Sequence, residues 1–554
     1  MKEIAVYCVN TGETVRIPAG STLQEAARLI KPQGLGLITS AKVNNVLEGL
    51  EYELYSNKDV EFLGISSVVG LYTYVRSLLF VMSKAIKDVY PGTAIFIEAP
   101  ISNGLYCEVR RLDRPVDDEV AQAVKRRMKE IIDADLPFIK VHTHTQDAID
   151  LFRQRDLTSK ARLLESIGTL YTTYYTLEGE PDYYYGALMP STGSLEIFDV
   201  MAMADGLLLR IPDPRNPEAL LPFVKQEKML DVIKEHKRWH RILGVKNVGE
   251  LNVVSGQKTL TNSVINVAEA LQEKKIANIA EDIEARGGVK LVLIAGPSSS
   301  GKTTFSKRLS VQLMAAGIKP VAIAMDDYFV DRDKTPRDES GDYDFESLYA
   351  LDIARLQSDL NALMNGEEVE LPKYDFTTGK SVSSHNRLKI DEHTVIVMEG
   401  IHGLNPELTA AIPDEKKYKV FVSALTTIQL DSHNFIPTSD NRLLRRIVRD
   451  FKYRNYTAED TISRWPKVLA GERKWIVPYQ EEADVMFNSA LLFELAGLRT
   501  QALPLLERVP ECAPEYSEAY RLRKFLNYIQ PIRTEGLPPT SLLREFLGGS
   551  TFHY

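Results

Sequence analysis

The stretch Gly296-Pro297-Ser298-Ser299-Ser300-Gly301-Lys302-Thr303 follows the pattern G-x-x-x-x-G-K-[ST]. Residues 290–295 before it form an apolar run typical of a buried parallel strand, and residues 304–313 after it have helical periodicity. Between such elements, glycines let the backbone curl so that its N–H groups point at phosphate oxygens. The stretch therefore predicts a phosphate-binding loop at the start of a helix, whose dipole favours an anion.

Each position of such a loop has an expected task. Lys302 reaches the β- and γ-phosphates, and the Thr303 hydroxyl ligates Mg²⁺. We therefore expect ATP and Mg²⁺ as cofactors. The expected ATP-binding residues are Gly296, Ser298, Ser299, Ser300, Gly301, Lys302, Thr303 and Thr304.

Three further apolar runs, residues 321–325, 394–400 and 418–422, follow the loop. Helical segments between them, such as residues 351–364, predict βαβ alternation and a parallel sheet, so the fold class is α/β. Two of the runs end in acids, Asp326 and Glu399. The carboxyl ends of parallel strands form the ligand crevice, where Asp326 can accept a hydroxyl proton and Glu399 can hold Mg²⁺.

A cluster of arginines follows the last of these runs. Its members are Arg442, Arg445, Arg446, Arg449 and Arg454. At helical spacing Arg442, Arg446 and Arg449 share one face, and guanidinium groups stabilise charge on a transferring phosphoryl group. A surface helix with salt bridges explains two or three arginines better than five.

The ordered set of motifs resembles the uridine kinase and phosphoribulokinase group of P-loop kinases. The matching stretches are residues 296–304, 325–329, 371–376, 398–401 and 442–450, extended by residues 475–479 and 483–485. The resemblance covers about residues 288–490. It implies a kinase that uses ATP to phosphorylate the 5′-hydroxyl of a nucleoside.

Under this resemblance Asp326 is the catalytic base, and Thr303 and Glu399 hold Mg²⁺. Tyr374 and Asp375 join Asp326 in the substrate-binding site. The other catalytic residues are cations around the phosphates, the three arginines forming a lid: Lys302, Arg446, Arg449 and Arg454.

Two positions depart from the uridine kinase pattern. A histidine that contacts the pyrimidine is replaced by Gly379, and a second lid arginine is replaced by Tyr456. Because Gly379 makes no side-chain hydrogen bond and opens volume, we expect relaxed or shifted base specificity, with uridine the best single guess. His385 is an alternative source of the contact if its loop folds back.

Residues 1–64 have the order of a small β-rich unit. Overlapping capping boxes at Ser21-Thr22-Leu23-Gln24-Glu25 open a short helix to Ile30. The expected strands are residues 4–9, 13–17, 37–43, 52–54 and 60–63. This order resembles the TGS domain, a β-grasp module of threonyl-tRNA synthetases, and an unrelated small α+β domain is the alternative.

Residues 65–225 resemble the editing domain of threonyl-tRNA synthetases. The expected elements are a helix over 72–89, strands over 94–98 and 104–109, and a helix over 116–134. The synthetase H-x-x-x-H pair falls on Arg76 and Phe80, and its later cysteine and histidine fall near Tyr184 and Leu188. Because this set does not bind zinc, the resemblance implies a catalytically dead copy.

Histidine pairs elsewhere were weighed as metal sites. His142 and His144 share one face of an expected strand, but two imidazoles make a poor site without a third ligand. His236 and His240 have zinc-pair spacing on a helix, yet their charged neighbours favour a solvated face. Tyrosines 171, 174, 175, 183, 184 and 185 could stack on bases, although strand composition explains them more simply.

The expected organisation has five parts. They are a TGS-like domain (1–64), an editing-like domain (65–225), a helical linker (226–287), a P-loop kinase domain (288–490) and a helical tail (491–554). Proline-rich residues 212–217 mark one boundary. The tail receives no chemistry.

Composition sets the remaining expectations. Three separate cysteines and a start without a signal-peptide core predict a cytoplasmic protein, and no apolar run is long enough to span a membrane. A nucleoside is the expected partner, and a homo-oligomer stays open. The rival hypothesis is an NTPase that binds RNA or ribosomes through its N-terminal domains, which the net charge of −9 disfavours. A third makes those domains a ligand sensor.

Overall fold

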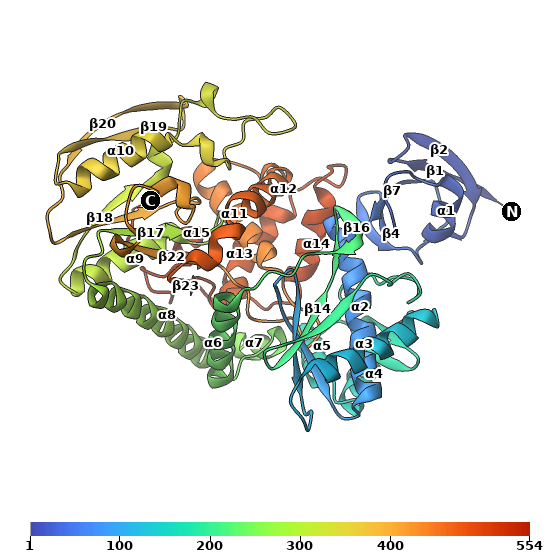
Figure 1. Cartoon of the computed structure of the whole chain (residues 1–554). Helices are drawn as coiled ribbons and strands as arrows, with labels where there is room; N and C mark the ends of the chain where they lie inside the picture. The colour runs from blue at the N-terminus through green and yellow to red at the C-terminus, as the bar shows by residue number, and fades with distance from the viewer. Residues whose placement is uncertain (1, 554) are drawn as a thin grey trace.

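The computed structural model describes residues 2–553. Figure 1 shows the N-terminal units on one side, the P-loop sheet on the other, and the C-terminal helices between them. Among the described residues, no helix combines the length and apolar character needed to cross a membrane. All three cysteines are free thiols, with Cys8 and Cys107 buried and Cys512 exposed.

The first unit is a five-stranded β-grasp sheet in the order β2-β1-β7-β4-β5. Its strands are β1 (Glu3–Cys8), β2 (Glu13–Pro18), β4 (Ile38–Val43), β5 (Val46–Gly49) and β7 (Lys58–Gly64). The pair β1 and β7 is parallel, while the other pairs are antiparallel. Thr22 and Glu25 form the capping box of α1 (Leu23–Ile30), and β3 (Ser21–Thr22) pairs with β6 (Glu53–Leu54). The sequence analysis did not anticipate β5.

The second unit packs two helices on a four-stranded sheet in the order β13-β14-β9-β8. Its elements are α2 (Val68–Val89), α3 (Asp118–Asp133), β8 (Ala94–Ile101), β9 (Gly104–Arg110), β13 (Asp199–Met203) and β14 (Gly206–Arg210). The other elements are β10 (Ile139–His144), β11 (Tyr171–Leu177), β12 (Glu180–Asp182), β15 (Pro212–Asp213), β16 (Asn216–Leu220), α4 (Thr145–Gln154) and α5 (Thr158–Ile167). His142 and His144 do share one face of β10, where both pack near the ring of Tyr171.

Three helices connect this unit to the P-loop sheet: α6 (Glu227–Leu243), α7 (Val248–Ser255) and α8 (Lys258–Arg286). The expectation that His236 and His240 lie on a solvated face of α6 is wrong, because they are 6% and 5% exposed. Burial lowers the pKa of His236 to about 3 and that of His240 to about 4. Of the charged neighbours, Lys234, Glu235 and Lys237 are themselves half-buried, so the charges did not mark a solvated face.

The P-loop sheet is fully parallel, with strand order β18-β21-β17-β22-β23. Its strands are β17 (Leu291–Ala295), β18 (Lys319–Ala324), β21 (Thr394–Glu399), β22 (Lys417–Ser423) and β23 (Val485–Asn488). Helices α8 and α9 (Lys302–Ala315) cover one face and α10 (Ile353–Met364) the other. The hairpin of β19 (Val369–Asp375) and β20 (Lys380–Leu388) stands beside this sheet.

Short 3-10 helices lie in the loops of this region. They are η1 (Met325–Tyr328), η2 (Arg332–Lys334), η3 (Leu348–Ala350), η4 (Pro406–Thr409), η5 (Asp414–Lys416) and η6 (Val477–Glu482).

The arginine helix α11 (Thr438–Arg454) and α12 (Ala458–Trp475) pack with α13 (Glu494–Leu506), α14 (Tyr516–Leu526) and α15 (Arg544–Leu547). Their apolar side chains form one core that also includes residues of α4, α5, α7 and α8. The C-terminal segment is therefore built into the centre of the molecule (Figure 1).

Candidate active site

The phosphate loop lies between β17, whose five residues are all buried, and α9. Ser299 and Gly301 take left-handed backbone conformations, with φ of 61° and 84°. Gly296 passes so close to β22 that an added Cβ would lie 2.0 Å from the Val422 carbonyl oxygen. The glycine spacing therefore serves the curl of the loop and its approach to the neighbouring strand.

Side chains from two strand ends meet at the loop. The Thr303 hydroxyl donates to Glu399 Oε1 at 2.9 Å, so the two predicted Mg²⁺ ligands are neighbours. Burial lowers the pKa of Lys302, while Glu399 and then Asp326 oppose that shift. Burial also raises the pKa of Glu399. Oxygen ligands on adjacent elements suit Mg²⁺, which keeps several water ligands and takes few from protein.

Asp326 lies in η1, directly after β18. Ala324, two residues before it, is paired in the sheet with Glu399, so both acids lie at the carboxyl edge of the sheet. Burial raises the pKa of Asp326, and the positive charges of Lys302 and Arg454 oppose that shift. Asp327 faces the hairpin instead, where Oδ1 accepts from the Tyr374 amide at 3.4 Å.

Arginines of helix α11 make direct hydrogen bonds to the phosphate loop. Arg442 Nε donates to the Ser298 carbonyl at 3.0 Å, and Arg446 Nη1 donates to the Ser298 hydroxyl at 2.8 Å. Arg445 is fully buried and donates to the Ser299 carbonyl at 3.2 Å while its guanidinium pairs with both oxygens of Glu494.

Three of the arginines share one carboxylate. Asp450 pairs with Arg446, Arg449 and Arg454 at 3.3, 2.8 and 3.7 Å. Arg454 lies at the end of α11 and its side chain is 53% exposed. The sequence analysis assigned a lid over the phosphates to Arg446, Arg449 and Arg454, and it missed that Arg442 and Arg445 contact the loop. Their acidic partners, Glu472 and Glu494, are distant in sequence, and no local pattern marks them.

Several buried polar atoms in this part of the described chain have no protein partner. They are Ser299 Oγ, Ser300 Oγ and Arg442 Nη2. Such unpaired donors around a curled loop are costly unless a ligand satisfies them. A polyphosphate supplies acceptor oxygens at this place, so the residues present fit ATP.

The predicted acceptor residues lie on the hairpin. Tyr374 is buried against Phe329 and Phe376, and its hydroxyl finds no hydrogen-bond partner among residues 2–553. Asp375 instead caps the turn, since its carboxylate accepts from the Thr377 amide and the Thr378 hydroxyl, both at 2.8 Å.

The space expected at Gly379 is filled. Gly379 has φ of 69°, and an added Cβ would lie 2.8 Å from the guanidinium carbon of Arg332. His385 does not fold back, because its side chain is 89% exposed on β20 beside Glu370. Arg332, which donates to the Phe376 carbonyl at 2.7 Å, is the side chain that occupies the position, and the sequence analysis missed it.

The residues aligned with the synthetase zinc set do converge in the second unit. The Phe80 and Tyr184 rings lie 5.6 Å apart, Arg76 Nε donates to the Ala187 carbonyl at 3.1 Å, and Leu188 is buried. Within residues 2–553, no group of three or more metal-ligating side chains is found.

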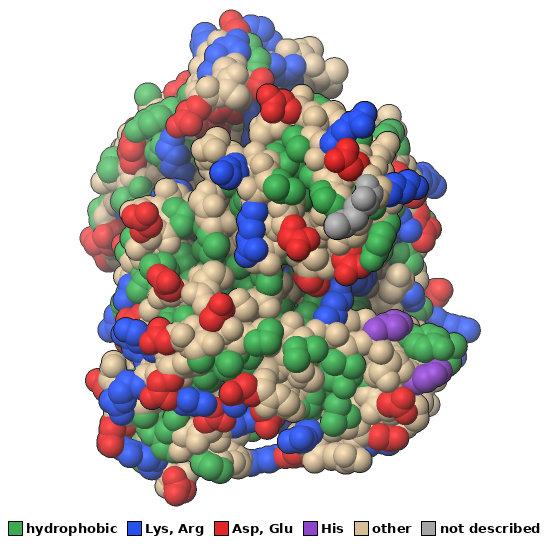
Figure 2. Space-filling model, turned by 90° about the vertical axis from the view of Figure 1, so that its right-hand side faces the viewer, with side chains coloured by type: hydrophobic (Ala, Val, Ile, Leu, Met, Phe, Trp, Pro, Cys, Tyr) green, Lys and Arg blue, Asp and Glu red, His purple; other side chains and the backbone are tan. Residues whose placement is uncertain are grey.

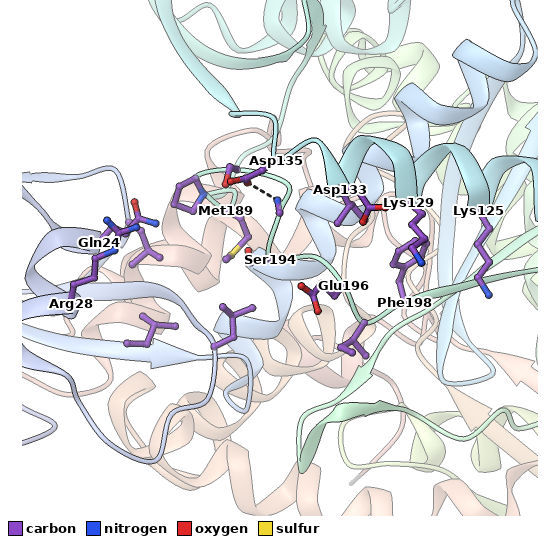
Figure 3. Close-up of a pocket in the computed structure, with 18 residues that line it drawn as sticks. Gln24, Arg28, Lys125, Lys129, Asp133, Asp135, Met189, Ser194, Glu196 and Phe198 are labelled. Atoms are coloured by element: carbon purple, nitrogen blue, oxygen red, sulfur yellow. Dashed lines mark hydrogen bonds between the residues drawn. The ribbon is translucent and has the colours of Figure 1, made fainter.

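A cavity of about 960 Å³ lies between the β-grasp unit and the second unit and is lined by residues of both. Figure 3 shows Gln24 and Arg28 of α1 on one side and Lys125, Lys129 and Asp133 of α3 on the other. Its basic residues are matched by Asp133, Asp135 and Glu196, and Lys125 pairs with Asp199 at 2.8 Å. Figure 2 likewise shows acidic and basic side chains intermixed on this side of the molecule. The described residues of this face therefore form no broad basic patch of the kind typical of RNA binding.

Residues 291–492 match the family model described as "Phosphoribulokinase / Uridine kinase family". These residues form a domain of that kinase family. The matched range begins at β17 and ends just beyond β23, so it contains the phosphate loop, both strand-end acids and the arginine helix.

Curated relatives match the two halves of the chain separately. A uridine kinase of Halobacterium salinarum is 26% identical over 232 residues, covering 42% of this chain and 90% of the relative. One from Halalkalibacterium halodurans is 29% identical over 197 residues, covering 35% and 84%. A threonine–tRNA ligase of Rubrobacter xylanophilus is 26% identical over 248 residues, covering 42% of this chain and 38% of the ligase.

The N-terminal region is therefore homologous to threonyl-tRNA synthetases, although the chain spans little more than a third of the ligase length. Among solved structures, "Structure of a Possible Uridine Kinase from Bacillus stearothermophilus" is 21% identical with a TM-score of 0.27, covering 39% of this chain and 98% of that chain.

Proposed function

We propose that this protein transfers the γ-phosphoryl group of ATP to the 5′-hydroxyl of a nucleoside. The observation that carries the proposal is the meeting of Lys302, Thr303, Glu399 and Asp326 at one sheet edge under an arginine helix. The kinase-family match over the same residues and the uridine kinases among the relatives support it.

In this proposal Asp326 accepts the proton of the attacking hydroxyl, and Lys302 with the α11 arginines offsets charge on the phosphoryl oxygens. Thr303 and Glu399 would hold Mg²⁺, which supplies positive charge between the phosphates when bound. Arg446 already contacts the loop through the Ser298 hydroxyl. Arg449 and Arg454 are proposed to close over the phosphates from the end of α11.

The acceptor is proposed to lie against the aromatic hairpin, with the unpaired Tyr374 hydroxyl available for a hydrogen bond. Arg332 fills the place beside Gly379, so we propose that a guanidinium faces the base edge there. A guanidinium donates hydrogen bonds but never accepts them. It therefore favours a base edge that presents a carbonyl oxygen, such as O4 of uracil, over an edge that presents an amino group, as cytosine and adenine do. We propose that Asp375 stabilises the turn of the hairpin and also contacts the acceptor.

The test is a screen of purified protein with ATP and Mg²⁺ against uridine, cytidine, adenosine, guanosine and sugar phosphates. We expect a nucleoside 5′-monophosphate as product, with uridine the best acceptor by kcat/KM. Lack of turnover on every nucleoside, with turnover on a sugar phosphate or another alcohol, would refute the nucleoside assignment. The variant Arg332→Ala should narrow the difference between uridine and cytidine.

The N-terminal region supports a second candidate function. Its homology to threonine–tRNA ligases supports RNA as a partner, with ATP hydrolysis coupled to RNA rather than to a nucleoside. The mixed charges around the interdomain cavity and the net charge of −9 weigh against it. Stimulation of ATP hydrolysis by RNA, and not by nucleosides, would favour this candidate.

We further propose the boundaries 1–64, 65–225, 226–287, 288–490 and 491–554, and an editing-like unit without catalysis. Arg76, Phe80, Tyr184 and Leu188 at the core of that unit support the loss of chemistry, because none of them is a zinc ligand.

A further inference from the structure

The segment between β22 and α11, which we call the approach segment (residues 424–437), leads directly into the arginine helix. It passes along the editing-like unit and not through solvent. Ile97 donates its amide to the Ser432 carbonyl at 2.9 Å, and Gln429 Nε2 donates to Glu98 Oε2 at 2.7 Å. The segment that sets where α11 begins is thus fixed by another unit.

Buried charges make the firmest part of this contact. Lys160 of α5 lies 2.7 Å from Asp182 and 3.0 Å from Asp431, and His433 Nδ1 lies 2.6 Å from Asp182. All four side chains are 5% exposed or less. Asp431 also accepts from the amides of His433 and Asn434, which ties the ion cluster to the backbone of the approach segment.

We propose that Lys160 and Asp182 are positioning residues for the phosphate site, and this rests on the proposed function. They hold the approach segment so that α11 presents Arg442 and Arg446 to Ser298 of the phosphate loop. Arg442 lies in the second turn of α11, close enough that a shift of the segment moves its guanidinium with the helix. The editing-like unit thereby acts on the kinase without chemistry of its own. Tyr184, one of the residues in place of the zinc set, belongs to the same cluster because its hydroxyl donates to Asp182.

The test compares three variants at temperatures well below their melting points. Lys160→Met removes the central cation, and Gln429→Ala removes a tie to the same segment while its partner Glu98 keeps Lys237 as a counter-charge. Lys84→Met is the control, because Lys84 is a buried lysine of the same unit that pairs with Asp88 and Glu178, away from the kinase domain. The readouts are the Kd for ATP and hydrogen exchange over residues 438–454.

We expect Lys160→Met and Gln429→Ala to raise the Kd about fivefold or more and to speed exchange in α11. Lys84→Met should change the Kd by less than about twofold even if it lowers the melting temperature. An unchanged Kd in both test variants, or an equal effect of Lys84→Met, would overturn the inference. Because neither readout needs an acceptor, a failure to phosphorylate nucleosides would refute the proposed function separately.

A second, independent observation concerns the C-terminal segment. Glu545 of α15 is 9% exposed, and its Oε2 accepts from the Thr304 hydroxyl at 2.6 Å and from the Thr304 amide at 3.4 Å. Thr304 lies in the first turn of α9, where backbone N–H groups are expected to face phosphate. A carboxylate therefore already lies at the anion end of the phosphate-loop helix.

The segment around Glu545 is anchored. Leu542 packs with the core beside β17, and Phe546 lies under the Arg445 guanidinium at 4.8 Å. Lys452 Nζ donates to the Leu547 carbonyl at 2.5 Å. These contacts keep the backbone in place, so that a change at Thr304 involves the Glu545 side chain and not release of the tail.

We infer that the Glu545 carboxylate competes with the nucleotide phosphates at Thr304 and must swing away when ATP binds. Two anions held at one helix N-terminus repel each other, so the carboxylate weakens the binding of phosphate at the same place. The contact therefore lowers the affinity of the protein for nucleotide, and the negative charge of Glu545 is the cause.

The test uses Glu545→Gln, which keeps the shape and removes the charge, with Glu535→Gln as the control on an exposed tail carboxylate. Calorimetry with MgATP and with inorganic tripolyphosphate is expected to show the Kd of both falling about fivefold in Glu545→Gln. In Glu535→Gln both should stay within about twofold of wild type. Equal or weaker binding in Glu545→Gln would overturn the inference, and weaker binding of MgATP alone would make Glu545 a metal ligand.

Discussion

At the scale of single residues, the phosphate site brings opposite charges together in a crowded space. The negative charges of Glu399, Asp326 and Glu545 stabilise the charged form of Lys302. Its Nζ also donates to the Pro297 carbonyl at 3.2 Å. The lysine therefore contributes little to the apolar core, and its replacement tests phosphate binding and not folding.

Lys302→Ala should reduce phosphoryl transfer by at least about a hundredfold, because it removes the point charge on the β- and γ-phosphates. The melting temperature should change little. Turnover and thermal unfolding measured on the same preparation check this. Lys307→Ala, at a half-buried lysine of the same helix, is the control, and near-normal turnover in Lys302→Ala would remove the basis for the phosphate-loop assignment.

Asp326→Asn should lower kcat by about 10² to 10⁴, the usual contribution of a positioned general base, with little change in the Kd for ATP. Asp327→Asn should have the smaller effect, because Asp327 is engaged with the hairpin backbone. The opposite order would place the base one residue later.

The pH profile gives a second check on Asp326. Its pKa is raised by burial and lowered by Lys302 and Arg454, and only the ionised carboxylate accepts a proton. Activity should therefore be lost as pH falls through this raised pKa. Arg454→Gln removes one of the lowering charges, so the acid limb of kcat/KM should move to higher pH. An acid limb that stays in place would show that another group sets it.

At the scale of elements, helix α6 turns two histidines into buried neutral side chains. His236 rests on Trp239 with ring centroids 4.4 Å apart, and His240 Nε2 lies 3.3 Å from the Thr427 hydroxyl. Their folded pKa values of about 3 and about 4 lie below the value near 6.5 of an unfolded chain. The unfolded state therefore binds more protons between these limits.

The contribution of the two histidines to stability is therefore complete above pH 6.5, and it is lost progressively as pH falls toward 4 for His240 and toward 3 for His236. For His236 alone the loss by pH 5 is about 2 kcal/mol, from 1.5 pH units below its unfolded pKa. The urea midpoint should thus fall less between pH 7 and pH 5 in His236→Gln than in wild type. His142→Gln, on an exposed face of β10, should behave as wild type, and equal falls in all three proteins would contradict the assignment.

At the scale of the whole molecule, a synthetase-like region and a kinase-family domain share one core. The C-terminal helices pack against α4, α5 and α7 on one side and α11 on the other. Arg521 of α14 pairs with Asp440 at 2.6 Å at the start of α11, which adds a further tie. The parts are therefore expected to unfold together and not as separate domains.

Purified protein should contain no stoichiometric zinc, because Arg76, Phe80 and Leu188 offer no ligand atoms of the kind zinc binds. Elemental analysis after removal of any affinity tag measures this. One zinc per chain would show that the editing-like unit keeps a metal centre, and His142→Ala and His144→Ala would then test the exposed pair on β10.

The local sequence determined the phosphate loop, the parallel strands with acids at their ends, and the β-grasp order of the first unit. These follow from short-range patterns: apolar runs, capping residues and glycine spacing act within a few residues of one another. The expectation at α6 failed because charged residues on one side of a helix say nothing of what covers the other.

Only the tertiary structure decided which distant residues complete the site. Glu494 on Arg445, Arg332 over Gly379, Lys160 on Asp431 and Glu545 on Thr304 join residues 47 to 271 positions apart. No period or spacing encodes such contacts, since they arise when the units pack and each buried charge takes the partner that the shared core brings within reach.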